Sequence, residues 1–73
     1  MKLATKLTRA AEEIDMIDRL ADWGNIYLRN IVLIDRDVID FLGDLYGREA
    51  VEWISGRRAV MALLFAAEVA SRP

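Results

Sequence analysis

Near the C-terminus, residues 59–67 form an unbroken run of apolar side chains, which Glu68 interrupts before Val69 and Ala70 continue it. A surface helix shows one apolar stripe, whereas a helix that is apolar all round must be covered on every side. As a helix, residues 59–70 would rise only about 18 Å, too short to cross a bilayer core of roughly 30 Å. The run therefore predicts a central helix that other helices enclose.

In the first half of the chain, apolar residues recur every seven positions. One series is Leu7, Ile14, Ala21 and Leu28, and the second is Leu3, Ala10, Ile17, Gly24 and Ile31. The series are three residues apart, which is the a/d spacing of a helix that packs along a continuous seam. We expect one long helix over about 8–33, with Thr8 able to serve as its N-cap. A kink or break would fall at Gly24, because a helical glycine costs about 1 kcal/mol relative to alanine.

Shorter helices follow the seam. Residues 37–46 read as a helix capped by Asp35 or Asp37 and stopped by Gly47, with these residues inward: Val38, Phe41, Leu42 and Leu45. Residues 48–55 read as another, with Val51 and Ile54 inward and Gly56 as a left-handed stop. The apolar helix then begins at Arg57 or Arg58 and ends near Ser71. Since no segment alternates strictly between apolar and polar residues, the predicted class is all-α.

The small size of the chain bears on how the apolar helix is covered. A domain of 73 residues buries only about 60% of the surface that it exposes when unfolded. Such a chain can hardly enclose an all-round apolar helix alone, so we expect an intertwined or helix-packed homodimer. The residues expected in the core or the dimer contact are Leu28, Ile31, Val60, Leu63, Leu64 and Phe65.

The composition argues against an enzyme. Hydrophobic residues make up 55% of the chain and charged residues 30%, while histidine and cysteine are absent. The usual general base, the commonest metal ligand and thiolate chemistry are therefore missing. No Gly-rich loop suits a phosphate. We expect no catalysis, no metal and no cofactor.

The net charge of −2 is unlike that of a strongly basic nucleic-acid binder, although a local basic patch stays compatible with it. Met1 leads directly into an amphipathic pattern with no signal-peptide core, and no segment is suited to a membrane. The expected location is therefore the cytoplasm.

Aspartates at helical spacing form two acidic stripes, Asp15, Asp18 and Asp22 in the first and Asp37, Asp40 and Asp44 in the second. Either stripe is a solvated face opposite the core, in which Asp15 can pair with Arg19, or a docking stripe for a basic surface on another protein. Polar-tipped aromatics such as Trp53 are frequent both in small cores and in interface hot spots. The candidate partner-binding residues are Asp37, Asp40, Asp44, Trp53, Arg57 and Arg58.

Residues 53–58, Trp-Ile-Ser-Gly-Arg-Arg, resemble the end of the recognition helix in Cro/repressor-type helix-turn-helix proteins. Residues 38–43, Val-Ile-Asp-Phe-Leu-Gly, are similar to the first helix and turn glycine of that motif. The resemblance implies a DNA-binding role in which Arg57 and Arg58 would contact phosphates. The residues that it would turn toward the major groove are Arg48, Glu49 and Glu52.

A looser resemblance spans more of the chain. Residues 25–28, 34–36 and 41–43 are similar to the N-terminal half of the D subunit of the flagellar master transcription activator. That family is all-α and dimeric and works with a partner regulator, so the resemblance implies a small prokaryotic regulatory protein.

Three functions are therefore open. The first is a protein-interaction module, a bacterial or phage accessory protein that binds and modulates or inhibits a regulatory protein such as a transcription factor or a defence complex. The second is a helix-turn-helix repressor that binds DNA. The third is a purely structural oligomerisation domain. Acidic and aromatic helix faces, together with the lack of catalytic residue types, favour the first.

Overall fold

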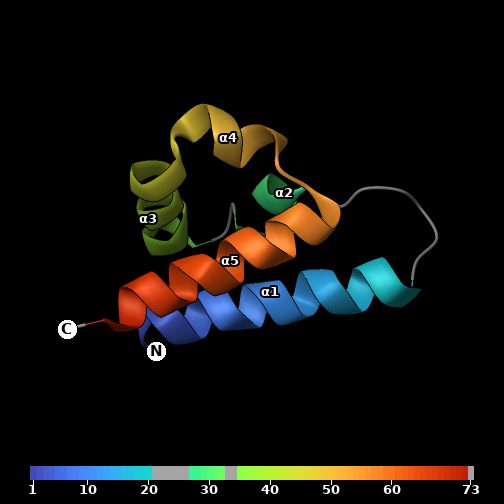
Figure 1. The fold of residues 1–73 in the computed structure, drawn as a ribbon, viewed down its shortest axis with the longest axis horizontal. Helices are drawn as coiled ribbons and strands as arrows, with labels where there is room; N and C mark the ends of the chain where they lie inside the picture. The colour runs from blue at the N-terminus through green and yellow to red at the C-terminus, as the bar shows by residue number, and fades with distance from the viewer. Residues whose placement is uncertain (21–26, 33–34, 73) are drawn as a thin grey trace.

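The computed structural model describes residues 1–20, 27–32 and 35–72. Within these residues the chain is helical and has no strand, which confirms the predicted all-α class. The helices are α1 (Leu3–Leu20), α2 (Leu28–Val32), α3 (Arg36–Tyr46), α4 (Arg48–Trp53) and α5 (Gly56–Ser71) (Figure 1).

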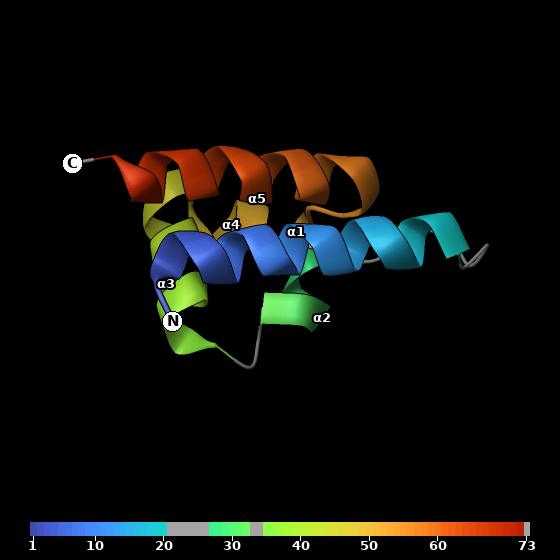
Figure 2. The same cartoon turned by 90° about the horizontal axis from the view of Figure 1, so that it is seen from below.

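The two long helices, α1 and α5, pack antiparallel along their lengths, so that the N- and C-terminal ends of the chain lie at the same end of the molecule (Figure 1 and Figure 2). Leu7 and Ile14 of the predicted seam are completely buried. The seam thus packs against the C-terminal helix of its own chain. Alanines make up much of the buried surface of this pair and let the helices approach closely; they are Ala11, Ala59, Ala62, Ala66 and Ala67.

The shorter helices α2, α3 and α4 cover one side of this pair (Figure 1). They contribute four buried side chains to the same apolar cluster, namely Leu28, Val38, Leu42 and Val51. Among the described residues no polar or charged residue is classed as buried. One continuous apolar core therefore holds the described helices together.

The prediction of a single helix over 8–33 is wrong. α1 already begins at Leu3. Thr8 therefore lies inside the helix and is not its N-cap, and its hydroxyl donates to the Ala4 carbonyl at 2.9 Å. α1 ends at Leu20, and α2 is a separate helix. The physical reason is tertiary, because the Leu28 N–H at the start of α2 donates to the Ile54 carbonyl at 2.9 Å, across the fold. The predicted kink or break at Gly24 lies outside the described residues.

The predicted boundaries of α3 are confirmed to within one residue. The Asp35 carboxylate caps α3 by accepting from the N–H groups of Asp37 and Val38, at 3.0 and 3.3 Å. Gly47, with a φ of +92°, ends the helix in a conformation that side chains other than glycine rarely adopt.

The segment between α4 and α5 differs from the prediction in one respect. α4 ends at Trp53 and not at Ser55, because Ile54 and Ser55 are extended and Ser55 pairs with Tyr27. Gly56 has the expected left-handed φ of +57°, but it opens α5. α5 then runs to Ser71, close to the predicted end of the apolar helix.

Candidate interaction surfaces

The apolar helix α5 is covered on one face and exposed on the other. Its exposed large side chains are Met61, Leu64 and Phe65, which are 61, 43 and 49% exposed. Their spacing of three and four residues places them on one face of the helix. Val60 and Leu63, from the same predicted set, are buried. We call Met61, Leu64 and Phe65 the α5 apolar face.

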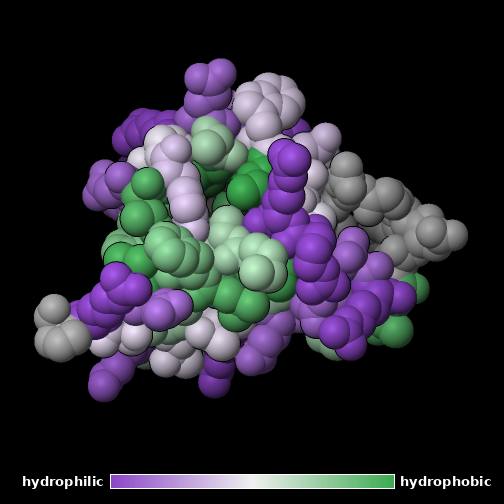
Figure 3. All heavy atoms as spheres, in the orientation of Figure 1, coloured by the Kyte–Doolittle hydropathy of each residue, from purple (hydrophilic) through white to green (hydrophobic). Residues whose placement is uncertain are grey.

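The position of α5 explains this one-sided cover. In Figure 2, α5 lies at the outer edge of the molecule, with the other helices to one side of it. In Figure 3, apolar side chains cover the middle of α5 and hydrophilic side chains lie toward both of its ends. An exposed apolar patch with a polar rim is typical of a contact surface for another macromolecule.

Charged residues flank the α5 apolar face. Arg57, at the start of α5, lies 2.8 Å from Asp15 and 3.9 Å from Asp18 of α1, so these ion pairs tie the two long helices together. The expected pair between Asp15 and Arg19 is present at 3.3 Å. Asp22, the third residue of that stripe, lies outside the described residues. The first acidic stripe is thus largely engaged within the chain.

Arg58 and Glu68 are also exposed and lie beyond either end of the α5 apolar face. Among the described residues Arg58 has no ion pair, whereas Glu68 pairs with Arg72 at 3.5 Å, one turn later in the sequence. Arg57 and Arg58, which the sequence grouped together, therefore differ in their surroundings. Of these two arginines, Arg58 is the one whose guanidinium has no ion-pair partner in the described part of the chain.

The second acidic stripe lies on the outer face of α3. Asp37, Asp40 and Asp44 are all exposed, while Val38 and Leu42 on the opposite face are buried. Asp37 pairs with Lys6 of α1 at 3.6 Å. In the described part of the chain, Asp40 and Asp44 carry no such pair. We call these two residues the α3 acidic face.

The exposed Trp53 side chain, 62% accessible to solvent, contacts a residue that the sequence pattern did not single out. The Arg29 guanidinium lies 5.4 Å from the centre of the Trp53 ring and 4.9 Å from that of Tyr27. Both distances fit cation–π interactions. Arg29 reaches Trp53 because the pairing of Tyr27 with Ser55 brings α2 to the end of α4, a contact for which the sequence carries no signal.

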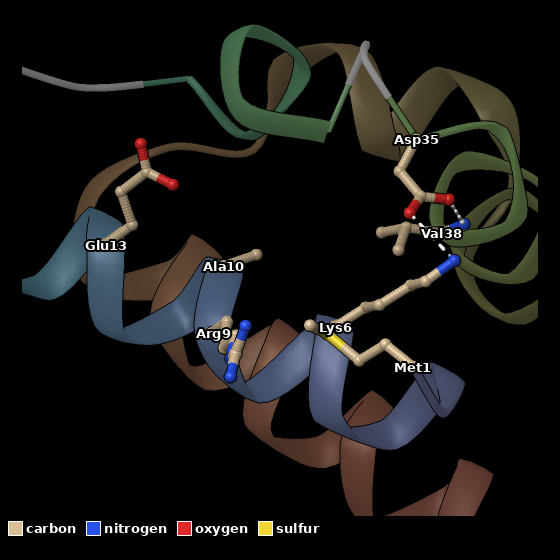
Figure 4. Close-up of a pocket in the computed structure, with 7 residues that line it drawn as sticks. All are labelled: Met1, Lys6, Arg9, Ala10, Glu13, Asp35 and Val38. Carbon is tan, nitrogen blue, oxygen red and sulfur yellow. Dashed lines mark hydrogen bonds and ion pairs between the residues drawn. The ribbon is translucent and has the colours of Figure 1, made fainter.

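A shallow hollow of about 220 Å³ separates α1 from the start of α3, and Figure 4 shows Lys6 crossing it to Asp35. The Lys6 ammonium lies 3.0 Å from the Asp35 carboxylate. The hydrogen bond from Lys6 lowers the pKa of Asp35, and the same bond raises the pKa of Lys6. The other residues that line the hollow are Met1, Arg9, Ala10, Glu13 and Val38. This bridge fastens α3 to α1.

The residues that resemble a helix-turn-helix are divided among three elements. α4 has only 6 residues, and two extended residues separate it from α5. Arg57 and Arg58 therefore lie on a different helix from Arg48, Glu49 and Glu52, and all five are exposed.

Comparison with known proteins does not assign a family. The chain matches no protein-family model, no curated protein and no solved structure. The helices that the structure describes include none that is both long and apolar enough to span a membrane.

Proposed function

We propose that this protein is a non-catalytic interaction module, a homodimer that binds and modulates a second, regulatory protein. The observation that carries the proposal is the α5 apolar face, which leaves three large apolar side chains exposed on a helix whose opposite face is buried in the core. In the proposed dimer the α5 apolar face is the contact between copies. The α3 acidic face stays open to the second protein.

The partition of α5 into two faces supports self-association. Its buried face supplies much of the core of the single chain, and the apolar side chains on its outer face lie outside that core cluster. Burying a large apolar side chain is worth about 1.5–3 kcal/mol when the burial is complete. A second copy contributes an identical face, and closed two-fold dimers are the commonest assemblies of soluble proteins.

The α3 acidic face supports binding of a basic protein surface, such as the DNA-binding face of a regulator. Asp40 and Asp44 lie one turn apart on the exposed side of a helix whose other side is anchored in the core. Opposite charges across an interface speed encounter and select the correct partner. Such a protein acts by covering the surface that its partner uses.

Neighbouring leucines on α5 provide the test. Leu63 is fully buried and Leu64 is 43% exposed, so Leu63→Asp buries an unpaired charge and is expected to unfold the chain. Leu64→Asp is expected to preserve the helical circular dichroism spectrum and to convert a dimer into a monomer of 8.3 kDa in multi-angle light scattering at micromolar concentration. A wild-type protein that is already monomeric under these conditions contradicts the proposal.

A further inference from the structure

We propose that two copies of α5 pair antiparallel across a two-fold axis at the level of position 63, with Arg58 of each copy bound to Glu68 of the other. This arrangement rests on the proposed homodimer and specifies its geometry. Its basis is the order of side chains along the exposed face of α5, which is basic, apolar and then acidic.

The register follows from the spacing. Arg58 precedes Met61 by three residues, and Glu68 follows Phe65 by three residues. Residues separated by three or four positions share a helix face, so both charges lie in line with the α5 apolar face. The whole stripe spans about 15 Å along the helix.

In an antiparallel pair, residues at equal distances on opposite sides of the axis meet. Position 63 is midway between Met61 and Phe65, and it is also midway between Arg58 and Glu68. One register therefore satisfies both the apolar contact and the ion pairs. In this register Leu64 lies close to the axis and packs against the Leu64 of the second copy.

Charge disfavours the parallel alternative. Parallel helices would place Arg58 against Arg58 and Glu68 against Glu68, which repel. Antiparallel helices bring opposite charges together and also align the helix dipoles favourably. Arg57 does not compete with Arg58 for Glu68, because Arg57 forms ion pairs with Asp15 and Asp18 of its own chain.

The fold leaves room for this pairing. α5 forms the outer edge of the molecule in Figure 2, and the ribbons of α1, α3 and α4 all lie to one side of it. Glu68 forms only an exposed pair with Arg72 at 3.5 Å. Its carboxylate has a second oxygen for Arg58 of the second copy.

Charge reversal tests the register. Arg58→Glu and Glu68→Arg are each expected to raise the dimer Kd about tenfold, because two ion pairs are lost and repulsion replaces them. The double variant Arg58→Glu/Glu68→Arg restores the pairs and is expected to return the Kd to near the wild-type value. Glu49→Arg makes the same charge change as Glu68→Arg, but on the exposed surface of α4; it serves as the control for that variant and is expected to leave the Kd unchanged. The measurement is sedimentation equilibrium at low ionic strength.

Introduced cysteines distinguish the two directions, since the chain has no cysteine of its own. A mixture of Arg58→Cys and Glu68→Cys chains is expected to cross-link with a short bis-thiol reagent, while Arg58→Cys chains alone do not. Cross-linking of Arg58→Cys chains with each other overturns the antiparallel arrangement.

The outcomes separate this inference from the proposed function. If Leu64→Asp abolishes the dimer but Arg58→Glu/Glu68→Arg does not restore the wild-type Kd, the register is refuted while the dimer contact through α5 stands. A monomeric wild-type protein refutes both.

Discussion

At the scale of single residues, Tyr46 forms a polar contact between the α3–α4 side of the molecule and α5. Its phenol, at the end of α3, donates to the Ala62 carbonyl in the middle of α5 at 2.6 Å. Burial raises the pKa of Tyr46 above its ordinary value of 10.0. The neutral phenol donates this bond and a phenolate cannot, so the contact depends on pH.

Tyr46→Phe removes the donor while keeping the ring. A hydrogen bond of this kind contributes about 1 kcal/mol to the free energy of unfolding, so the variant is expected to be less stable by that amount. Urea denaturation followed by circular dichroism at pH 7 measures the difference. An unchanged midpoint and slope would show that the bond makes no net contribution.

High pH is expected to remove the contribution of Tyr46 to stability. Above about pH 10 the unfolded chain loses the Tyr46 proton while the folded chain retains it, so rising pH favours unfolding. This contribution is complete below pH 10 and is lost as pH rises through the folded pKa. The gap in stability between wild type and Tyr46→Phe should narrow above pH 10. The raised pKa of Lys6 also weakens stability at high pH, but equally in both proteins.

At the scale of elements, Asp35 has two tasks at the start of α3. Its carboxylate accepts from two backbone N–H groups of the first turn and also from Lys6 of α1. The cap satisfies donors that a helix start leaves unpaired, and the ion pair sets the position of α3 against α1. One side chain thus determines both where the helix begins and where it lies.

Substitutions at Asp35 separate these tasks. Asp35→Ala loses both and is expected to lower the Tm at pH 7 more than Asp35→Asn, because asparagine still caps the helix. Lys6 lowers the pKa of Asp35 in the folded chain. The stability that the charged Asp35 carboxylate adds to the wild type is therefore lost as pH falls below about 3.8 and through the folded pKa. The Tm gap between wild type and Asp35→Asn should therefore narrow in acid. Equal Tm values for Asp35→Ala and Asp35→Asn at pH 7 would contradict a capping role.

At the scale of the whole molecule, the α5 apolar face and the α3 acidic face lie on different helices. The α5 apolar face is on the outer edge of the helix pair, and the α3 acidic face is on the covering helices. A dimer formed through the α5 apolar face leaves both copies of the α3 acidic face exposed. Two acidic faces on one particle suit a partner that is itself a symmetric dimer.

The α3 acidic face makes a prediction about partner binding. Asp40→Asn/Asp44→Asn is expected to reduce capture of a basic partner protein from bacterial lysate, measured by pull-down and quantitative mass spectrometry, without affecting the dimer. Glu12→Gln/Glu13→Gln makes the same change of charge on the exposed surface of α1 and should leave capture intact. If the two variants capture equally, net charge and not the α3 acidic face determines binding. Steeply salt-dependent binding to duplex DNA that Arg57→Ala/Arg58→Ala abolishes would instead support the repressor.

The features that the sequence predicted correctly are those whose determinants are local. Asp35 caps its own helix, Gly47 ends it, and the apolar run is a helix that ends near Ser71, because each depends on neighbouring residues. The predicted single helix over 8–33 was wrong, because the heptad spacing continues to Ile31 while the Leu28 N–H donates to the Ile54 carbonyl across the fold. Of the candidate site, the sequence indicated the exposed aspartates of α3 but not the partnership of Trp53 with Arg29.

The residues by themselves therefore determined the helical class, the start and end of α3, and an apolar helix with more hydrophobic surface than one side can bury. Only the tertiary structure decided which side of that helix is covered, since α1 takes the alanine-rich face and leaves Met61, Leu64 and Phe65 in solvent. It also decided that Arg57 is held by α1 while Arg58 is not. The physical reason is range: caps and turns act within a few residues, whereas burial and ion pairing depend on helices brought together from opposite ends of the chain.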